Sequence, residues 1–170
     1  MLATVLTQID AALAGRVQSI TCVLRSPDDP GVLLPDNMTL PLFPLVLSDE
    51  QADNGMGFSL AAASKACCDA DAIMVFLADM PAIRPQTMQA VYDALDVQRI
   101  SVPVCQGRRG HPVGFGRDFF SELQQLRADK GAKSLLSAYH QDVSEVVVHD
   151  SGVLLDIDTV AEWHDFNRNK

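Results

Sequence analysis

Residues 72–78 read Ala-Ile-Met-Val-Phe-Leu-Ala, and this run ends at Asp79-Met80-Pro81. A continuous apolar run of this length is typical of a parallel strand that is buried on both faces of a sheet. The pattern therefore predicts a strand over 72–78, with a carboxylate at the point where the strand ends. In α/β sheets, ligands bind beside such strand ends.

The remaining predicted elements alternate around that strand. Helices are expected over residues 2–13, 59–67, 85–95, 119–126 and 132–140, and a last one after the capping-box pattern at 159–162. Strands are expected over residues 20–24, 45–47, 100–104, 113–115, 145–148 and 153–157. A loop signal at 26–31 and the prolines at 30, 35, 41 and 44 exclude a regular element up to Pro44. Strands that alternate with helices predict one α/β domain, residues 1–170, with a mostly parallel sheet.

Composition and charge limit the classes of function. The 170 residues carry a formal charge of −9, with 48% hydrophobic and 21% charged residues, which is typical of a globular domain. The acidic balance argues against a nucleic-acid partner. No targeting or membrane-spanning pattern is present, so no membrane partner is expected. Four cysteines without paired spacing (Cys22, Cys67, Cys68 and Cys105) indicate a reduced, cytoplasmic protein.

Basic residues concentrate between residues 106 and 133. This stretch contains six basic residues, including Lys130, and three acidic residues, including Asp129. Arg108 and Arg109 lie in a glycine-flanked turn, and guanidinium groups there suit phosphate or carboxylate recognition. His111 precedes Pro112 and is interpreted either as a proton carrier or as a packing residue. The cluster is the candidate site for an anionic ligand.

Acidic residues follow two of the predicted strands. Asp79 ends the strand over 72–78, and Asp156 and Asp158 lie on one face at the end of the strand over 153–157. One interpretation is a Mg²⁺ site, because this ion is held by one or two carboxylates together with substrate phosphates. The other is structural: Asp79 caps a turn and Asp158 caps the last helix.

Gly55-Met56-Gly57-Phe58-Ser59 forms a predicted turn into a helix. Backbone N–H groups at such a helix start bind anions. The pattern is not a dinucleotide fingerprint, because Leu60 stands where a third small residue is needed. The alternative is a permissive loop in which Ser59 caps the helix.

Taken together, four motifs resemble the MobA-like nucleotidyltransferases, and most closely their molybdenum-cofactor cytidylyltransferase branch. The motifs are residues 55–61 (GMGFSLA), 77–81 (LADMP), 107–113 (GRRGHPV) and 154–159 (LLDIDT). The resemblance implies a Rossmann-like three-layer sandwich. It implies transfer of a nucleoside monophosphate from an NTP (CTP or GTP) to a phosphorylated acceptor such as molybdopterin, with release of pyrophosphate.

The resemblance also implies roles for particular residues. Asp79 becomes the Mg²⁺ carboxylate, with Ala78 in place of the usual glycine, and Asp158 the second metal contact, with Asp156 less certain. The nucleotide-binding segment is Gly55, Met56, Gly57 and Ser59. The acceptor-binding segment is Arg108, Arg109, Gly110, His111 and Pro112.

One family segment has no counterpart in these 170 residues. The family opens with a strand and a glycine-rich loop (L-A-A-G-x-x-x-R-M-G-x-x-K), whereas Met1 aligns with the helix that follows. We therefore expect two uncovered strand edges and weak binding of NTP·Mg²⁺ by this form. Three interpretations fit: part of a longer transferase, a non-catalytic relative that binds a pterin or nucleotide-like ligand, or a protein that interacts, including as a homo-oligomer, through an uncovered sheet edge.

Overall fold

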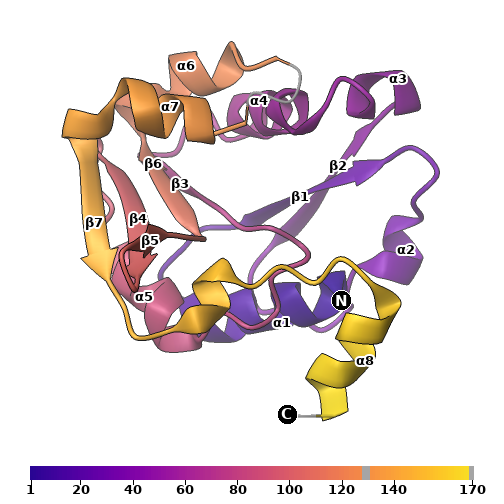
Figure 1. Ribbon diagram of the computed structural model, residues 1–170. Helices are drawn as coiled ribbons and strands as arrows, with labels where there is room; N and C mark the ends of the chain where they lie inside the picture. Colours follow the sequence, from indigo (N-terminus) through magenta and orange to yellow (C-terminus); the bar gives the residue numbers. More distant parts are fainter. Residues whose placement is uncertain (128–130, 169–170) are drawn as a thin grey trace.

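The computed structural model describes residues 1–127 and 131–168, which form three layers (Figure 1). Helices α1 (Leu2–Leu13) and α5 (Pro85–Asp93) lie on one side of the strands. Helices α4 (Met56–Ala66), α6 (Phe120–Gln124) and α7 (Lys133–Ala138) lie on the other. The expected α/β three-layer sandwich is confirmed.

The strands form two hydrogen-bonded sheets rather than one. Strands β1 (Ile20–Arg25) and β2 (Leu42–Leu47) pair in parallel. The larger sheet has the order β3-β6-β4-β5, with β7 also paired to β4; its strands are β3 (Ala72–Val75), β4 (Ile100–Cys105), β5 (Arg108–Arg109), β6 (Val113–Gly116) and β7 (Val143–Val147). β3 and β4 run in the same direction because both are antiparallel to β6, and β7 is parallel to β4. Strands β5 and β6 run against these three, so the larger sheet is mixed rather than mostly parallel as predicted.

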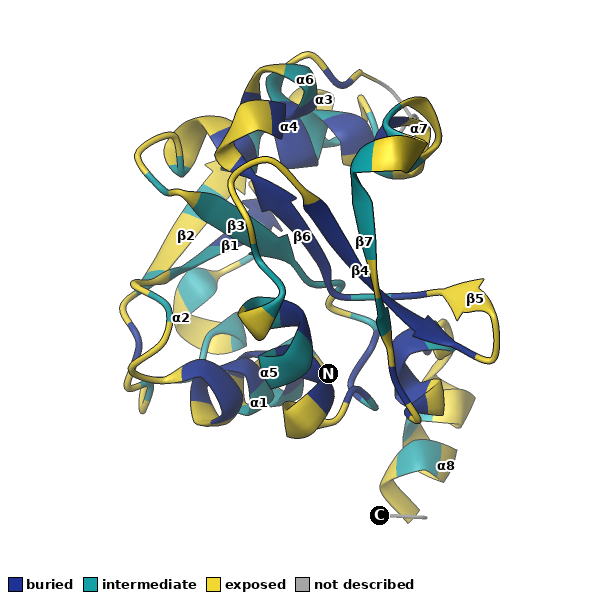
Figure 2. Cartoon of the chain, turned by 90° about the vertical axis from the view of Figure 1, so that its left-hand side faces the viewer, coloured by how far each residue is buried: buried dark blue, intermediate teal, exposed yellow. Residues whose placement is uncertain are grey.

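The apolar run over 72–78 is less buried than its sequence predicts. Only Ala72–Val75 are in β3, and all four are half-buried, whereas every residue of β4 is buried (Figure 2). Among the described residues, β3 pairs with β6 on one side only, and β1 with β2 on one side only. An uncovered edge explains the partial exposure of β3. Both faces of the strand are nevertheless covered as predicted, because Ile73 and Val75 pack against one core and Met74 packs against the other.

Each helical layer has its own apolar core. Between α4, α6 and the larger sheet lie residues such as Leu60, Phe115 and Leu123. On the opposite side, Val5, Ile9 and Leu13 of α1 recur at helical spacing and pack with Met88 and Val153. The C-terminal segment therefore belongs to the layer of α1 and α5.

Two short helices stand where no helix was predicted. α2 (Pro30–Leu33) begins with proline at its first position, and the Asp29 carboxylate accepts the Gly31 N–H at 2.9 Å. α3 (Asp49–Ala52) starts at a capping box, in which the Ser48 hydroxyl and the Gln51 side chain each accept the other's backbone N–H. Capping by Asp29 thus allows a short helix to form in the proline-rich segment before Pro44, and the capping box starts α3 after it.

The C-terminal region also differs from expectation. Residues 153–157 do not form a strand; residues Ser151–Leu154 form a 3-10 helix, η3, because the Asp150 carboxylate accepts the Gly152 N–H at 3.0 Å. The last helix, α8 (Val160–Arg168), begins as predicted at the Thr159–Glu162 box. Short 3-10 helices also cover Arg117–Phe119 (η1) and His140–Asp142 (η2). In the described part of the chain, no helix is long and apolar enough to cross a membrane.

Candidate functional site

Asp79 lies in a turn four residues beyond the end of β3. Met80 and Ile83 anchor the turn, because both side chains are buried in the core beside α1 and α5. The Asp79 Oδ1 atom is shielded from solvent and has no hydrogen-bond partner among the described residues. Burial of an unpaired carboxylate oxygen is unfavourable, so this atom is suited to a cation.

The segment of residues 106–112 is a tight hairpin rather than a loop. Gln106 and Gly107 have positive φ (52° and 75°) and connect β4 to β5, after which Gly110 and Pro112 are buried. The His111–Pro112 peptide bond is cis. The chain thus turns inward after Arg109, and it carries His111 from the exposed hairpin into the protein.

Helix η3 connects the two preceding segments. On one side, His111 N–H donates to the Val153 carbonyl at 3.0 Å, and a Cβ on Gly110 would lie 2.2 Å from that carbonyl oxygen. On the other side, a Cβ on Gly152 would lie 2.1 Å from the Ala82 carbonyl oxygen. Just beyond η3, Ile157 N–H donates to the Asp79 carbonyl at 2.9 Å. Three motifs distant in sequence therefore meet at one place.

Asp150 is a site-supporting residue that the sequence analysis missed. Its side chain is 4% exposed, and it accepts the Arg84 N–H at 2.8 Å, the Thr87 hydroxyl at 2.7 Å and the Gly152 N–H at 3.0 Å. It therefore ties η3 to the first turn of α5, directly after the Asp79 turn. The Asp-Ser-Gly pattern at 150–152 is a turn signal that could have revealed it.

His111 is held by both backbone and side chain. Burial lowers the pKa of His111, and this effect outweighs a hydrogen bond to the Val75 backbone and the nearby Asp79 carboxylate, which both raise it. The Asp79 carboxylate is therefore near enough to the imidazole to influence its pKa. His111 Nδ1 is shielded from solvent and has no partner among the described residues.

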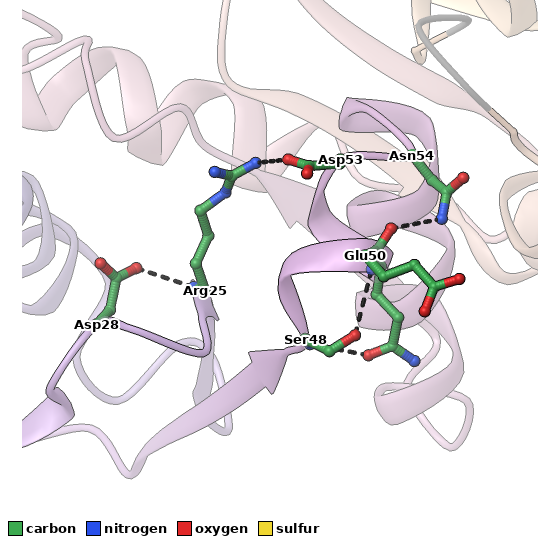
Figure 3. Close-up of polar contacts among 7 residues, drawn as sticks. Arg25, Asp28, Ser48, Glu50, Asp53 and Asn54 are labelled. Atoms are coloured by element: carbon green, nitrogen blue, oxygen red, sulfur yellow. Dashed lines mark hydrogen bonds and ion pairs between the residues drawn. The ribbon is translucent and has the colours of Figure 1, made fainter.

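The predicted nucleotide-binding segment is helical rather than a loop. α4 begins at Met56, with Gly55 at φ +88° as its N-cap, so Gly57 and Ser59 lie in its first turns. Ser59 is therefore not the helix cap. The segment is anchored from the preceding residues: Arg25 pairs with Asp53 at 2.5 Å, and Asn54 donates to the Glu50 carbonyl at 2.8 Å (Figure 3).

The other predicted site residues occupy different places. α4 lies in the layer opposite α1 and α5, whereas Met80 and Ile83 of the Asp79 turn pack in the layer of α1 and α5 (Figure 1). Arg108 and Arg109 are exposed, and Arg109 pairs with Glu145 at 2.8 Å. Within the described ranges, no three acidic, histidine or cysteine side chains form a metal cluster.

The acidic C-terminal pair does not lie at a strand end, because residues 155–158 form no regular element. Asp156 and Asp158 are exposed on either side of buried Ile157. The Asp158 N–H donates to Glu162 at 3.1 Å, so the Asp158 backbone is bound to the start of α8. Asp129 and Lys130 of the basic stretch lie outside the described residues.

Comparison with protein families gives a match to the MobA-like NTP transferase domain over residues 3–143. The chain belongs to this family. Among curated proteins, none matches the chain. The family is one of nucleotidyl transfer, and within this MobA-like NTP transferase domain the segments of Asp79, His111 and η3 are in backbone contact.

Solved structures share the fold of this MobA-like domain. Rv0371c from Mycobacterium tuberculosis H37Rv, solved in complex with manganese, is 24% identical with a TM-score of 0.77, covering 99% of this chain and 86% of that chain. A nucleotidyl transferase from Methanothermobacter is 17% identical with a TM-score of 0.73, covering 99% and 80%. The 4-diphosphocytidyl-2C-methyl-D-erythritol synthase of Anaerococcus prevotii is 12% identical with a TM-score of 0.74, covering 99% and 87%. These likenesses show the fold alone.

Proposed function

We propose that this chain transfers a nucleoside monophosphate from CTP or GTP to a phosphorylated acceptor such as molybdopterin, releasing pyrophosphate. The observation that carries the proposal is the convergence of the Asp79 turn and the Gly110–Pro112 segment on η3. Membership of the MobA-like NTP transferase family supports the type of reaction. The choice of base and acceptor rests on the motif resemblance.

The residues near Asp79 supply the metal-binding part of the proposal. Asp79, with its buried and unpartnered Oδ1, fits a divalent ion, and Asp158 follows Ile157, whose N–H is bonded to the Asp79 backbone. When bound, Mg²⁺ supplies neutralisation of the triphosphate charge. Rv0371c has been solved with manganese, which supports including Mn²⁺ in every assay.

The acceptor-binding part is the segment of residues 108–112. Arg108 is exposed and has no recorded ion-pair partner in the described part of the chain, so its guanidinium is available to an acceptor phosphate. Buried Gly110 and Pro112 hold His111 beside Asp79. An oxygen of the acceptor phosphate forms the new bond to the α-phosphorus, and the bond from the α-phosphorus to the bridging oxygen breaks, which releases pyrophosphate.

The direct test is pyrophosphate release from CTP or GTP in the presence of molybdopterin, with Mg²⁺ and with Mn²⁺. Asp79→Asn should lower the rate by at least about 100-fold, because transition-state charge is no longer neutralised. Asp118→Asn, at an exposed position in η1, is the matched control and should retain the rate. Transfer that is unaffected by Asp79→Asn would contradict the assignment of Asp79.

A second candidate is binding of a pterin or nucleotide-like ligand without transfer. It is favoured by the uncovered edges of β1 and β3 in the described residues, since no strand pairing joins the two sheets there. Isothermal titration with CTP, GTP and molybdopterin separates the candidates. Micromolar NTP binding with pyrophosphate release supports transfer, acceptor binding with weak NTP binding supports the binder, and binding of neither supports an interaction surface.

A further inference from the structure

Two unpartnered polar atoms lie in the candidate site. Asp79 Oδ1 and His111 Nδ1 are both shielded from solvent, and neither has a hydrogen-bond partner among the described residues. Two further atoms of this kind, Gln8 Oε1 and Ser64 Oγ, belong to α1 and α4. Buried polar atoms are almost always paired, so two unpaired atoms in one site point to a common missing partner.

The tautomer of the imidazole ring defines what its buried nitrogen can do. The Val75 backbone lies beside the His111 ring, and Nδ1 is the ring nitrogen that is buried without a hydrogen-bond partner. In the tautomer that carries its proton on Nε2, Nδ1 has a free lone pair. A metal-binding histidine uses such a tautomer, in which the second ring nitrogen donates to a carboxylate, a backbone carbonyl or water.

The backbone holds both side chains in place. The His111 N–H bonds the Val153 carbonyl, and the Ile157 N–H bonds the Asp79 carbonyl, so both residues are fixed to the segment that contains η3. Gly110 and Gly152 pack so tightly against Val153 and Ala82 that neither position has space for a Cβ. Both unpartnered atoms can offer a lone pair, so a cation held between them satisfies both.

We propose that His111 Nδ1 is a protein ligand, together with an Asp79 carboxylate oxygen, of the divalent ion in this site. The inference rests on the metal site in the proposed function and adds a nitrogen ligand to it. Imidazole nitrogen favours first-row transition ions, whereas Mg²⁺ prefers oxygen ligands alone. The pair therefore binds Mn²⁺ more tightly than Mg²⁺.

The test measures Mn²⁺ binding to the full 170-residue chain by electron paramagnetic resonance, with Mg²⁺ as competitor and no nucleotide. The wild-type spectrum should show electron spin echo modulation from a directly bound ¹⁴N nucleus. Absence of this modulation in the bound Mn²⁺ signal would overturn the proposal without the need for any variant.

Two substitutions separate the atoms of the ring. His111→Gln keeps a donor in reach of Val75 but removes the ligand at the Nδ1 position, and should weaken Mn²⁺ binding at least about tenfold. His111→Asn places an oxygen near the Nδ1 position. This variant should bind Mg²⁺ more tightly than His111→Gln does, and should prefer Mn²⁺ over Mg²⁺ less strongly than wild type does. His149→Gln, at an exposed position, is the control and should bind as wild type.

The variants also distinguish failure of this inference from failure of the proposed function. If Asp79→Asn binds Mn²⁺ as wild type, the metal site itself is wrong. If Asp79→Asn loses binding but His111→Gln does not, only the role of His111 is wrong. Mn²⁺ binding that depends on both residues supports the inference whether or not pyrophosphate is released. Circular dichroism of each variant verifies that it is folded.

Discussion

At the scale of single residues, Gly110 is the position where the backbone comes closest to η3. A Cβ there would lie 2.2 Å from the Val153 oxygen and 2.8 Å from its carbonyl carbon, and backbone cannot move aside as a side chain can. Gly110→Ala should lower the free energy of unfolding by about 1–3 kcal/mol, measured by urea denaturation. Gly131→Ala, whose Cβ would meet only Met56 Sδ at 3.7 Å, is the control. Equal stability of the two variants would argue against the close packing of Gly110.

Asp150 carries a second prediction at this scale. Three donors from Arg84, Thr87 and Gly152 lose their acceptor in Asp150→Ala, so the free energy of unfolding should fall by about 2–3 kcal/mol. Thr87→Val removes a single donor and should cost about 1 kcal/mol by the same urea measurement. A loss in Asp150→Ala no larger than that in Thr87→Val would show that the carboxylate does not hold η3 and α5 together.

At the scale of elements, Asp10 joins helix α1 to the segment before β2. Its carboxylate accepts the Thr39 N–H at 2.9 Å and the Leu40 N–H at 2.7 Å. These backbone hydrogen bonds lower the pKa of Asp10 below its ordinary value of 3.8, although burial opposes them. The stabilisation is therefore present above pH 3.8 and is lost as the pH falls through the pKa in the folded state.

Asp10→Asn tests this connection. The variant should be less stable than wild type at neutral pH, and the difference should shrink as the pH falls below 3.8, followed by urea denaturation from pH 7 to pH 2.5. Asp36→Asn, at an exposed position in the same connection, should change stability little at any pH. A difference for Asp10→Asn that is constant across the pH range would mean that the charged form is not what the two N–H groups stabilise.

At the scale of the whole molecule, the separation of the two sheets predicts uneven stability. β4 is paired on both sides and fully buried, whereas β3 is half-buried and paired only with β6 among the described residues. Backbone amides of residues 72–75 should therefore exchange with deuterium at least about tenfold faster than those of residues 100–105. Mass spectrometry of exchanged peptides measures both segments in one sample, and equal protection would contradict the uncovered edge.

Protein concentration distinguishes the alternatives for that edge. If copies of the chain associate through β1 or β3, as the homo-oligomer interpretation proposes, protection of residues 72–75 and the mass from light scattering should both rise with concentration. Protection that is unchanged while the mass stays that of 170 residues would exclude self-association through this edge.

Local patterns were sufficient for most elements and for the family. Helical spacing of Val5, Ile9 and Leu13 predicted α1, and the Thr159–Glu162 box predicted the start of α8, because both signals act within a few residues of the chain. Residues 153–157 were wrongly predicted as a strand, because the apolar pattern does not reveal that Asp150 caps a 3-10 turn.

Residue types and short spacings were enough to predict the alternation of strands and helices, the motif resemblance and Asp79 as a candidate ligand. Which strand is fully buried depends on the fold, because an apolar run is buried only when it has neighbours: β4 is paired on both sides and β3 is not. The structure alone also joined Gly110, Val153 and Asp79 through backbone contacts. Backbone N–H and C=O groups are nearly the same in every residue, so the pattern of side chains does not predict which backbone groups will form hydrogen bonds between distant segments.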